Sequence, residues 1–436
     1  MPSVRIITLG CSKNTVDTEH LLAQLPADAY EVLPEDYGGR VDFVLVNTCG
    51  FIGDAKQESI DTILAEAERK KAGLAGKLLV FGCLSQRYSS DLPALIPEVD
   101  GWFGARDLAP VVRALGTEPL HALRNSRSFA GGSYSYIKIS EGCDRRCSYC
   151  AIPFIRGAHR SVPIEDVVEE ARGLAAKGVK ELIVIAQDTT YYGLDLYGRR
   201  ALADLLRALS EVPGIEWIRL HYSYPEGFPE DVLREMAVNP KICKYLDIPL
   251  QHISDKVLHN MHRGVTGEWT RALIRRLREE IPGVALRTTV IVGHPGEGPS
   301  EFEELLDFVR EARFERLGAF QYSEEEGTWG ALNLADDVPA EEKQRRYDTL
   351  MSLQEGISAG FNASRVGGVV KVLADDVVNG RLVCRSQYES PEVDGEIIVT
   401  VPEGTDARSL VGKFLKVRIF ASEDYDLSAE IVNFET

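Results

Sequence analysis

The chain has 436 residues, 44% of them hydrophobic, which is enough to build two or three domains with packed cores. Its 49 basic residues against 67 acidic ones give a formal net charge of −18, and no run of clustered Lys and Arg appears. This balance argues against nucleic acid as a direct substrate and favours a basic protein partner; a surface charge that serves solubility alone is the alternative.

The N-terminal segment MPSVRIITLGCSKN lacks the basic and apolar regions of a signal peptide. No apolar run approaches the roughly 18 residues of a membrane span. We therefore expect a cytoplasmic protein without a membrane partner. In a reducing compartment, the eight cysteines of so large a chain favour metal binding or redox chemistry over disulfides.

The first hundred residues alternate short apolar runs with helical patterns. Three runs are predicted to be buried parallel strands: VRIITLG at 4–10, FVLVN at 43–47 and LLVFG at 78–82. Between the last two, the pattern predicts a helix that begins near Asp54 as its N-cap and ends at Gly73. This β-α-β alternation predicts an open doubly wound sheet.

A cysteine follows each of these three strands: Cys11, Cys49 and Cys83. Because the carboxyl ends of parallel strands meet at one edge of a sheet, we expect the three thiols to converge there as a three-thiolate metal site. The glycines beside them would allow tight loops around a bulky cluster, and they are Gly10, Gly50 and Gly82. The alternative is three unrelated small buried residues.

The polar stretch at 121–133 predicts a linker or clamp between domains. After it, six strand-like runs alternate with helical segments. The runs lie at 133–140, 182–186, 217–222, 245–250, 284–293 and 317–323. Six β/α units are too few for an eight-fold barrel, so we expect an open partial (β/α)6 barrel with its chemistry at the carboxyl ends of the strands.

Just after the first of these runs, the segment EGCDRRCSYC places Cys143, Cys147 and Cys150 in a CxxxCxxC spacing. Three thiolates can hold three irons of a four-iron cubane, and because no fourth cysteine is near, the fourth iron is left open for chemistry. A structural zinc site or a disulfide is the alternative, but zinc sites normally combine one CxxC with a second pair. Cys243 and Cys384 are isolated and are expected to be buried small residues.

From about residue 362 the pattern changes to five short strand-like runs without long helices, which predicts a small antiparallel β-barrel of the OB type. Between Ala363 and Thr436, eight basic residues stand against thirteen acidic ones, so we do not expect this barrel to bind nucleic acid. The chain is thus expected to be an α/β protein with three domains, at 1–124, 130–360 and 362–436.

Together with the two three-cysteine groups and the terminal barrel, five motifs give the chain a resemblance to the methylthiotransferases of the radical S-adenosylmethionine (SAM) superfamily. The motifs are GCSKNTVDTE, NTCGFI, AQDTTYYGLD, DIPLQHIS and YSEEEGT. They resemble the branch that methylthiolates an aspartate of ribosomal protein S12, and the resemblance covers residues 4–432. The terminal barrel would then be a TRAM domain and the middle one a radical SAM domain.

The resemblance implies a transferase with two 4Fe-4S clusters and SAM. The cluster on the CxxxCxxC cysteines would cleave SAM to a 5′-deoxyadenosyl radical, which removes a hydrogen from the aspartate β-carbon. The cluster on the N-terminal cysteines would carry or deliver the sulfur. One SAM would supply the methyl group and another the radical. A reductase or other electron donor and a sulfur donor are the further partners that this reaction implies.

Five residues near strand ends or the cysteine motif are candidates for SAM contacts: Tyr149, Gln187, Asp188, Gln251 and Arg287. A structural turn is the alternative for Gln187 and Asp188, and a structural role is an equal alternative for Gln251 and Arg287. Three histidines are not expected to form a metal site because their spacing spans a loop and a helix; they are His252, His259 and His262. The segment GHPGEG at 293–298 departs from the family's usual GFPGET at His294 and Gly298, which leaves the contacts there open.

Two rival functions stay open at this point. A transfer-RNA adenosine methylthiotransferase would have a basic TRAM domain and an Arg-rich motif after Tyr322 and Ser323, where this chain has Glu324, Glu325 and Glu326. A non-catalytic iron-sulfur electron carrier would have a fourth cysteine for each cluster.

Overall fold

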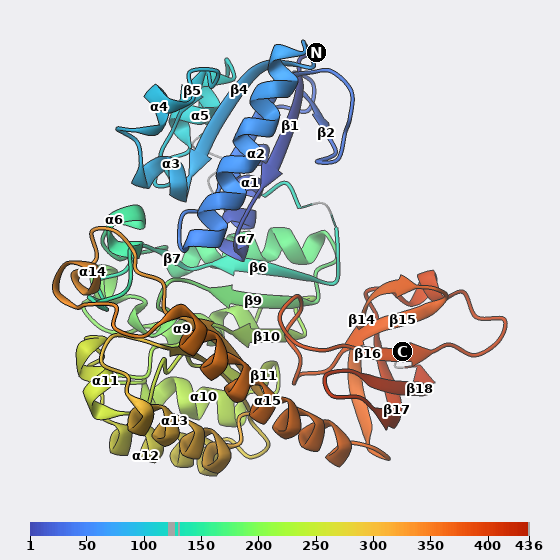
Figure 1. Cartoon of the computed structure of the whole chain (residues 1–436). Helices are drawn as coiled ribbons and strands as arrows, with labels where there is room; N and C mark the ends of the chain where they lie inside the picture. Colours follow the sequence, from blue (N-terminus) through green and yellow to red (C-terminus); the bar gives the residue numbers. More distant parts are fainter. Residues whose placement is uncertain (121–126, 130, 435–436) are drawn as a thin grey trace.

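The computed structural model describes residues 1–120, 127–129 and 131–434, which form two open sheets and a closed barrel (Figure 1). Residues 121–126 and 130, inside the predicted linker at 121–133, lie outside the described residues. Among the helices of the described ranges, none has the length and apolar character that crossing a membrane requires.

Within residues 1–120, the strands form one parallel sheet in the order β2-β1-β3-β4-β5. The bounds are β1 Ser3–Thr8, β2 Glu31–Leu33, β3 Val41–Thr48, β4 Ala75–Gly82 and β5 Gly101–Trp102. The three predicted strands are confirmed as β1, β3 and β4. The apolar pattern missed β2 and β5, because these edge strands have only three and two residues.

Helices cover both faces of this sheet, which confirms the doubly wound fold. On one face lie α1 (Ser12–Ala23) and α5 (Ala109–Ala114), and on the other lie α2 (Gly53–Lys71), α3 (Cys83–Arg87) and α4 (Leu92–Leu95). The predicted N-cap at Asp54 is wrong, because Ile52 precedes the first turn of α2. Asp54 lies inside that turn, where a carboxylate stabilises the positive end of the helix dipole.

Residues 131–364 contain an open partial barrel of six parallel strands in the order β6-β9-β10-β11-β12-β13, as predicted. The strands are β6 Tyr134–Lys138, β9 Glu181–Ile185, β10 Trp217–Leu220, β11 Ile242–Asp247, β12 Ala285–Val292 and β13 Arg316–Gln321. The main helices cover the outside of this sheet (Figure 1): α7 Ile164–Ala176, α9 Leu202–Ser210, α10 Glu230–Val238, α12 Gly267–Glu280, α13 Pro299–Ala312 and α15 Ala340–Ser364. One large apolar core joins the helices to the strands.

The last 70 or so residues close into a barrel in the order β14-β15-β16-β18-β17. Its strands are β14 Val369–Val378, β15 Arg381–Arg385, β16 Ile397–Thr400, β17 Phe414–Ser422 and β18 Leu427–Phe434. The barrel is antiparallel as predicted except for one parallel pair, β16 and β18. The segment after β16, which includes the short helix at Ala407–Leu410, leads to β17. The chain then turns back into β18, which pairs antiparallel with β17 and so runs in the same direction as β16.

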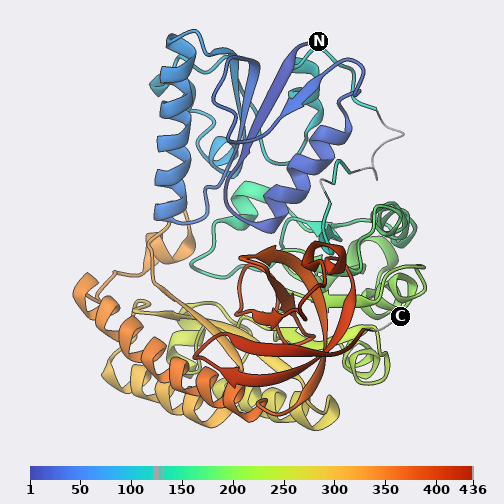
Figure 2. The ribbon, with the colours of Figure 1, turned by 90° about the vertical axis from the view of Figure 1, so that its right-hand side faces the viewer.

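Buried charges hold this barrel against the middle domain. In Figure 2 the barrel, in red, lies in front of the middle domain. Glu181 of β9 is fully buried and accepts hydrogen bonds from Arg219 of β10 at 2.6 Å and from Arg385 of β15 at 2.8 Å. Glu389 of the barrel likewise accepts one from Arg316 of β13 at 3.1 Å. The junction therefore buries charges of both signs from the barrel, the carboxylate of Glu389 and the guanidinium of Arg385.

Replacing Glu181 by Ala would leave two buried guanidinium groups without their shared carboxylate. Breaking a buried ion pair in this way costs about 3–5 kcal/mol. We therefore expect Glu181→Ala to lower the thermal unfolding temperature of the full chain in scanning calorimetry.

The control is Asp204→Ala, which removes a half-exposed carboxylate that pairs with Arg207 at 2.6 Å. Surface pairs of this kind contribute up to about 1 kcal/mol. Equal shifts for the two variants would contradict the importance of the buried junction.

Candidate functional site

The three N-terminal cysteines lie at the carboxyl ends of neighbouring parallel strands. Cys11 precedes the first turn of α1, Cys49 directly follows β3, and Cys83 begins α3 directly after β4. Cys49 and Cys83 are 8% and 7% exposed, whereas Cys11 faces solvent. Burial raises the pKa of Cys49, and the nearby Cys11 thiol adds to this rise. The strand order thus brings the three thiols to one edge of the sheet.

Glycines allow the loops of this group to approach each other closely. A Cβ on Gly10, which has φ +92°, would lie 2.9 Å from the Cys49 sulfur. A Cβ on Gly50 would lie 2.7 Å from the backbone nitrogen of Leu84. Backbone N–H groups of Gly50 and Phe51 donate to the Cys49 sulfur, and such bonds stabilise a thiolate. Gly10 and Gly50 therefore allow the loops that carry these cysteines to pack closely against each other.

The second group, Cys143, Cys147 and Cys150, lies on the loop between β7 (Ser140–Glu141) and α6 (Ile152–Arg156). The amide of Cys143 donates to the Gly157 carbonyl at 3.0 Å, which folds the loop back on β8 (Arg160–Ser161). Burial raises the pKa of the Cys143 thiol to about 12 and that of Cys150 further. These thiols stay protonated at neutral pH unless a metal displaces the protons.

Two arginines and a tyrosine surround Cys147, and the sequence did not single them out. The Tyr224 ring lies between the guanidinium groups of Arg145 and Arg263, which are 3.9 and 4.1 Å from its centroid. The Tyr224 hydroxyl lies 3.8 Å and Arg263 Nη1 lies 3.6 Å from the Cys147 sulfur. The presence of Arg145 inside the motif EGCDRRCSYC was the available signal for this arrangement.

The residues present fit an iron-sulfur cubane better than a single ion. In the part of the chain that the structure describes, no three Cys, His, Asp or Glu side chains stand close enough together to hold one metal ion. A cubane accepts wider spacing because each thiolate binds a different iron. The cradle of glycines, the amide donors to sulfur and the three thiols of each group suit that larger ligand.

Three of the proposed SAM contacts border the second cysteine group. Tyr149 packs edge-on against His294, with ring centroids 6.4 Å apart. Gln187 donates to Glu141 at 2.9 Å, and its own buried carbonyl oxygen has no hydrogen-bond partner among the residues that the structure describes. Asp188 accepts from Arg145 at 2.9 Å and also caps the turn at Thr189–Tyr191. Asp188 is thus already paired with the cysteine loop.

The other two lie farther along the sheet. Gln251 has φ +75°, and its backbone pairs with Thr289 and Ile291 at 2.8 Å. Arg287 pairs with Asp247 at 2.9 Å and approaches Asp394 of the C-terminal barrel at 3.8 Å.

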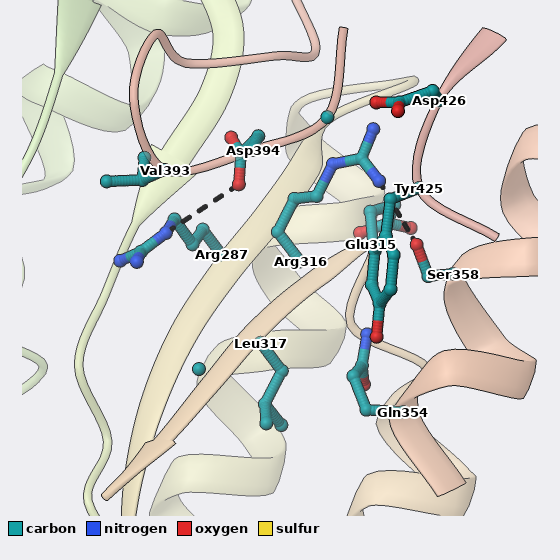
Figure 3. Close-up of a pocket in the computed structure, with 12 residues that line it drawn as sticks. Arg287, Glu315, Arg316, Leu317, Gln354, Ser358, Val393, Asp394, Tyr425 and Asp426 are labelled. Carbon is teal, nitrogen blue, oxygen red and sulfur yellow. Dashed lines mark hydrogen bonds and ion pairs between the residues drawn. The ribbon is translucent and has the colours of Figure 1, made fainter. Parts of the chain in front are cut away.

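Arg287 also lines a cavity of about 350 Å³ between the middle domain and the C-terminal barrel (Figure 3). None of the six cysteines is among the residues that line this cavity. The geometry therefore places Arg287 in a domain junction and gives no support to its predicted contact with SAM.

The remaining residues that the sequence singled out have packing or hydrogen-bonding roles in the fold. His252 is buried against Glu297 at 3.3 Å, and the His262 ring packs 4.2 Å from that of Trp329. His294 is fully buried beside Tyr322, and burial lowers its pKa to about 4. Gly298 precedes α13 and its amide donates to Glu301 at 2.8 Å. Cys243 and Cys384 are buried in apolar clusters, as predicted.

Glu325, from the acidic triplet after β13, connects the middle domain to the N-terminal one. It is 3% exposed and accepts hydrogen bonds from Lys56 of α2 at 3.0 Å and from Arg87 of α3 at 2.7 Å. The neighbouring Glu326 accepts one from the Tyr88 hydroxyl at 3.1 Å. Two of the three carboxylates that stand where the transfer-RNA rival would have an Arg-rich motif therefore serve the domain junction.

We expect Glu325→Gln to loosen this junction, because the neutral amide leaves two buried cations without their counter-charge. Hydrogen-deuterium exchange should show faster exchange in α2 and α3. Glu324→Gln is the matched control, because Glu324 is exposed in the same triplet. Equal exchange in both variants would mean that Glu325 does not hold the domains together.

Three family descriptions match the chain. They are the radical SAM superfamily at residues 137–309, the TRAM domain at 366–432, and the uncharacterized protein family UPF0004 at 3–104. Among solved structures, the radical SAM methyltransferase TsrM from Kitasatospora setae, with cobalamin and a 4Fe-4S cluster bound, has a TM-score of 0.55 at 17% identity. That likeness covers 73% of this chain and 75% of TsrM, and it shows the fold alone.

Similar relatives extend over almost the whole chain. The protein named ribosomal protein uS12 methylthiotransferase RimO from Cytophaga hutchinsonii is 50% identical over 98% of both chains. Proteins of the same name from Bacteroides fragilis and Porphyromonas gingivalis are 48% and 49% identical over 99% of both chains. The chain therefore belongs to the RimO family of methylthiotransferases, within the radical SAM superfamily.

Proposed function

We propose that the chain adds a methylthio group to the β-carbon of an aspartate in ribosomal protein uS12, with two 4Fe-4S clusters and SAM. The observation that carries the proposal is the presence of two three-cysteine groups, each one thiolate short of a fully ligated cubane. The full-length likeness to proteins named uS12 methylthiotransferases supports this substrate.

The three cysteines of the CxxxCxxC loop are proposed to hold the cluster that acts on SAM. When bound, SAM and a reduced cubane with an open iron supply a carbon radical that removes hydrogen from an unactivated carbon. The chain contributes the thiolates and the donors that surround them: the amides of Arg145 and Ile152, and the Arg263 guanidinium.

Tyr149 and Gln187 are the proposed SAM contacts with most support, because both border this loop and Gln187 has a buried oxygen free to accept a hydrogen bond. Asp188 is proposed to act by holding Arg145 in place. Gln251 stays a proposed contact at the end of the sheet. The N-terminal group of Cys11, Cys49 and Cys83 is proposed to hold the cluster that presents the sulfur.

Two further partners follow from the chemistry, since the reaction consumes electrons and sulfur: a reductase or other electron donor, and a sulfur donor. A ribosomal substrate implies work in the cytoplasm. We propose that the chain has three domains with separate roles. Residues 1–124 hold the sulfur-presenting site, residues 130–360 hold the radical site, and residues 362–436 form the TRAM domain.

No feature of the described residues favours the rival substrate, transfer RNA. The chain is acidic, with a formal net charge of −18, and the segment after Tyr322 and Ser323 carries carboxylates where an RNA-binding enzyme needs arginines. The electron-carrier alternative is disfavoured because each group has three cysteines rather than four.

The proposal is tested by incubating the reconstituted, reduced enzyme with SAM, sulfide and purified uS12. We expect uS12 to gain the mass of one methylthio group in place of one hydrogen, located by tandem mass spectrometry on an aspartate. Transfer RNA in place of uS12 should gain nothing. Modified nucleoside with unmodified uS12 would overturn the proposal.

A second prediction concerns Gly142, directly before the CxxxCxxC cysteines. It has φ +78°, and a Cβ there would lie 2.1 Å from the Ala158 carbonyl oxygen, so Gly142→Ala must displace the loop. We expect this variant to lose roughly half of its iron after reconstitution, because one of two clusters is affected.

Gly178→Ala is the control for Gly142→Ala, since Gly178 has φ +97° but nothing within 4 Å of the added carbon. It should keep its full iron content despite a backbone strain of about 1–2 kcal/mol. Full iron in both variants would show that the loop does not bind a cluster.

A further inference from the structure

The short helix α6 carries a buried arginine, Arg156, from the CxxxCxxC loop into the N-terminal domain. Arg156 is 4% exposed. Its Nη1 donates to Asp17 of α1 at 2.7 Å and to the Ala105 carbonyl at 3.3 Å. Its Nη2 donates to the Asn14 side chain at 2.7 Å. A residue that follows Cys150 by six positions is therefore bonded mainly to the other domain.

The partners of Arg156 surround the first cysteine group. Asn14 lies three residues after Cys11, and its side-chain oxygen also lies 3.9 Å from the Cys83 sulfur. Arg156 Nη2 donates to this same Asn14 oxygen, so that only one side chain separates the guanidinium from the Cys83 sulfur. Arg156 is thus a buried cation beside a sulfur of the proposed sulfur-presenting site.

An apolar contact supports the same junction. Cys83 and Ala105 of the N-terminal domain form one buried cluster with Ala151 and Ile155 of the middle domain. Ala151 directly follows Cys150, and Cys83 is itself one of the N-terminal cysteines. The two cysteine groups are therefore joined by direct packing as well as by Arg156.

The charges around Arg156 balance without a cluster. Asp17 also accepts a hydrogen bond from Lys138 of β6, and Glu141 accepts from Lys138 at 2.6 Å and from Arg156 at 3.3 Å. Two cations and two anions thus form a compact buried network. A cluster on three thiolates adds negative charge beside this network, and of the two cations Arg156 is the one that donates to Asn14, whose side-chain oxygen lies 3.9 Å from the Cys83 sulfur.

We infer that Arg156 is a positioning residue for the N-terminal cluster: it fixes Cys83 against the radical site, and its charge favours the reduced cluster. Charge and hydrogen bonds near the sulfurs are among the factors that set the reduction potential of such clusters. The inference rests on the proposed function, because it assumes a cluster at Cys11, Cys49 and Cys83.

The test uses full-length protein with Cys143, Cys147 and Cys150 replaced by Ala, so that one cluster is observed. Its reduction is followed by electron paramagnetic resonance in a redox titration, with and without Arg156→Met. We expect Arg156→Met to lower the equilibrium constant for reduction about tenfold, which corresponds to about 59 mV for one electron. Arg156→Lys keeps the charge and should shift it less.

Arg106→Met is the matched control. Arg106 donates to the carbonyls of Ile155 and Phe154 at 3.0 and 2.7 Å, so it contacts the same helix from the N-terminal domain but is itself exposed. It should leave the potential unchanged. A second variant, Arg156→Met with Asp17→Asn, removes one anion together with the cation, so that Lys138 and Glu141 remain as a balanced pair and misfolding is limited.

Equal potentials and equal iron contents for the parent, Arg156→Met and the double variant would overturn the inference while leaving the proposed function intact. Loss of iron in Arg156→Met and in the double variant, with iron kept in Arg156→Lys and Arg106→Met, would support the inference. Arg156 would then be needed to hold the cluster site itself. A parent that binds no iron would overturn both the inference and the proposed auxiliary cluster.

Discussion

The ion pair between Arg156 and Asp17 is the interaction on which the rest of the functional region depends. It joins two domains at a place from which water is excluded, where either charge alone would be costly. The two cysteine groups belong to different sheets and have no covalent connection other than the long chain between them. Their mutual position is therefore set by this pair, by the apolar contact beside it and by the ion pair of Glu325 with Arg87 of α3.

Both junctions of the middle domain are made in the same way. Glu181 joins it to the C-terminal barrel through Arg219 and Arg385, as Asp17 and Glu325 join it to the N-terminal domain. Apolar burial is non-directional, so two apolar faces can slide over one another. Hydrogen-bonded ion pairs have a narrow range of allowed distances and angles, so they fix one orientation. A reaction between groups on different domains needs that fixed orientation more than it needs additional stability.

The sequence was most informative about features that local patterns encode. Apolar runs predicted β1, β3, β4 and all six strands of the partial barrel, and the position of each N-terminal cysteine after a strand predicted their common edge.

The misses have physical causes. Strands β2 and β5 are too short to produce a pattern. Arg156, Arg263 and Glu325 act through partners distant along the chain, and burial of charge leaves no periodic signal. For the same reason the sequence did not reveal that Glu325 binds two cations of another domain, or that Arg287 approaches Asp394 of the C-terminal barrel.

The position of α6 directly after Cys150 has a consequence for how the protein matures. The loop that carries Cys143, Cys147 and Cys150 continues directly into α6, whose Arg156 bonds to the neighbouring domain. A change in the conformation of this loop would therefore also change the contact between the two domains. Quality control by cellular proteases acts on loosely assembled molecules. A copy in which the cysteine loop is displaced would therefore also be more open to degradation.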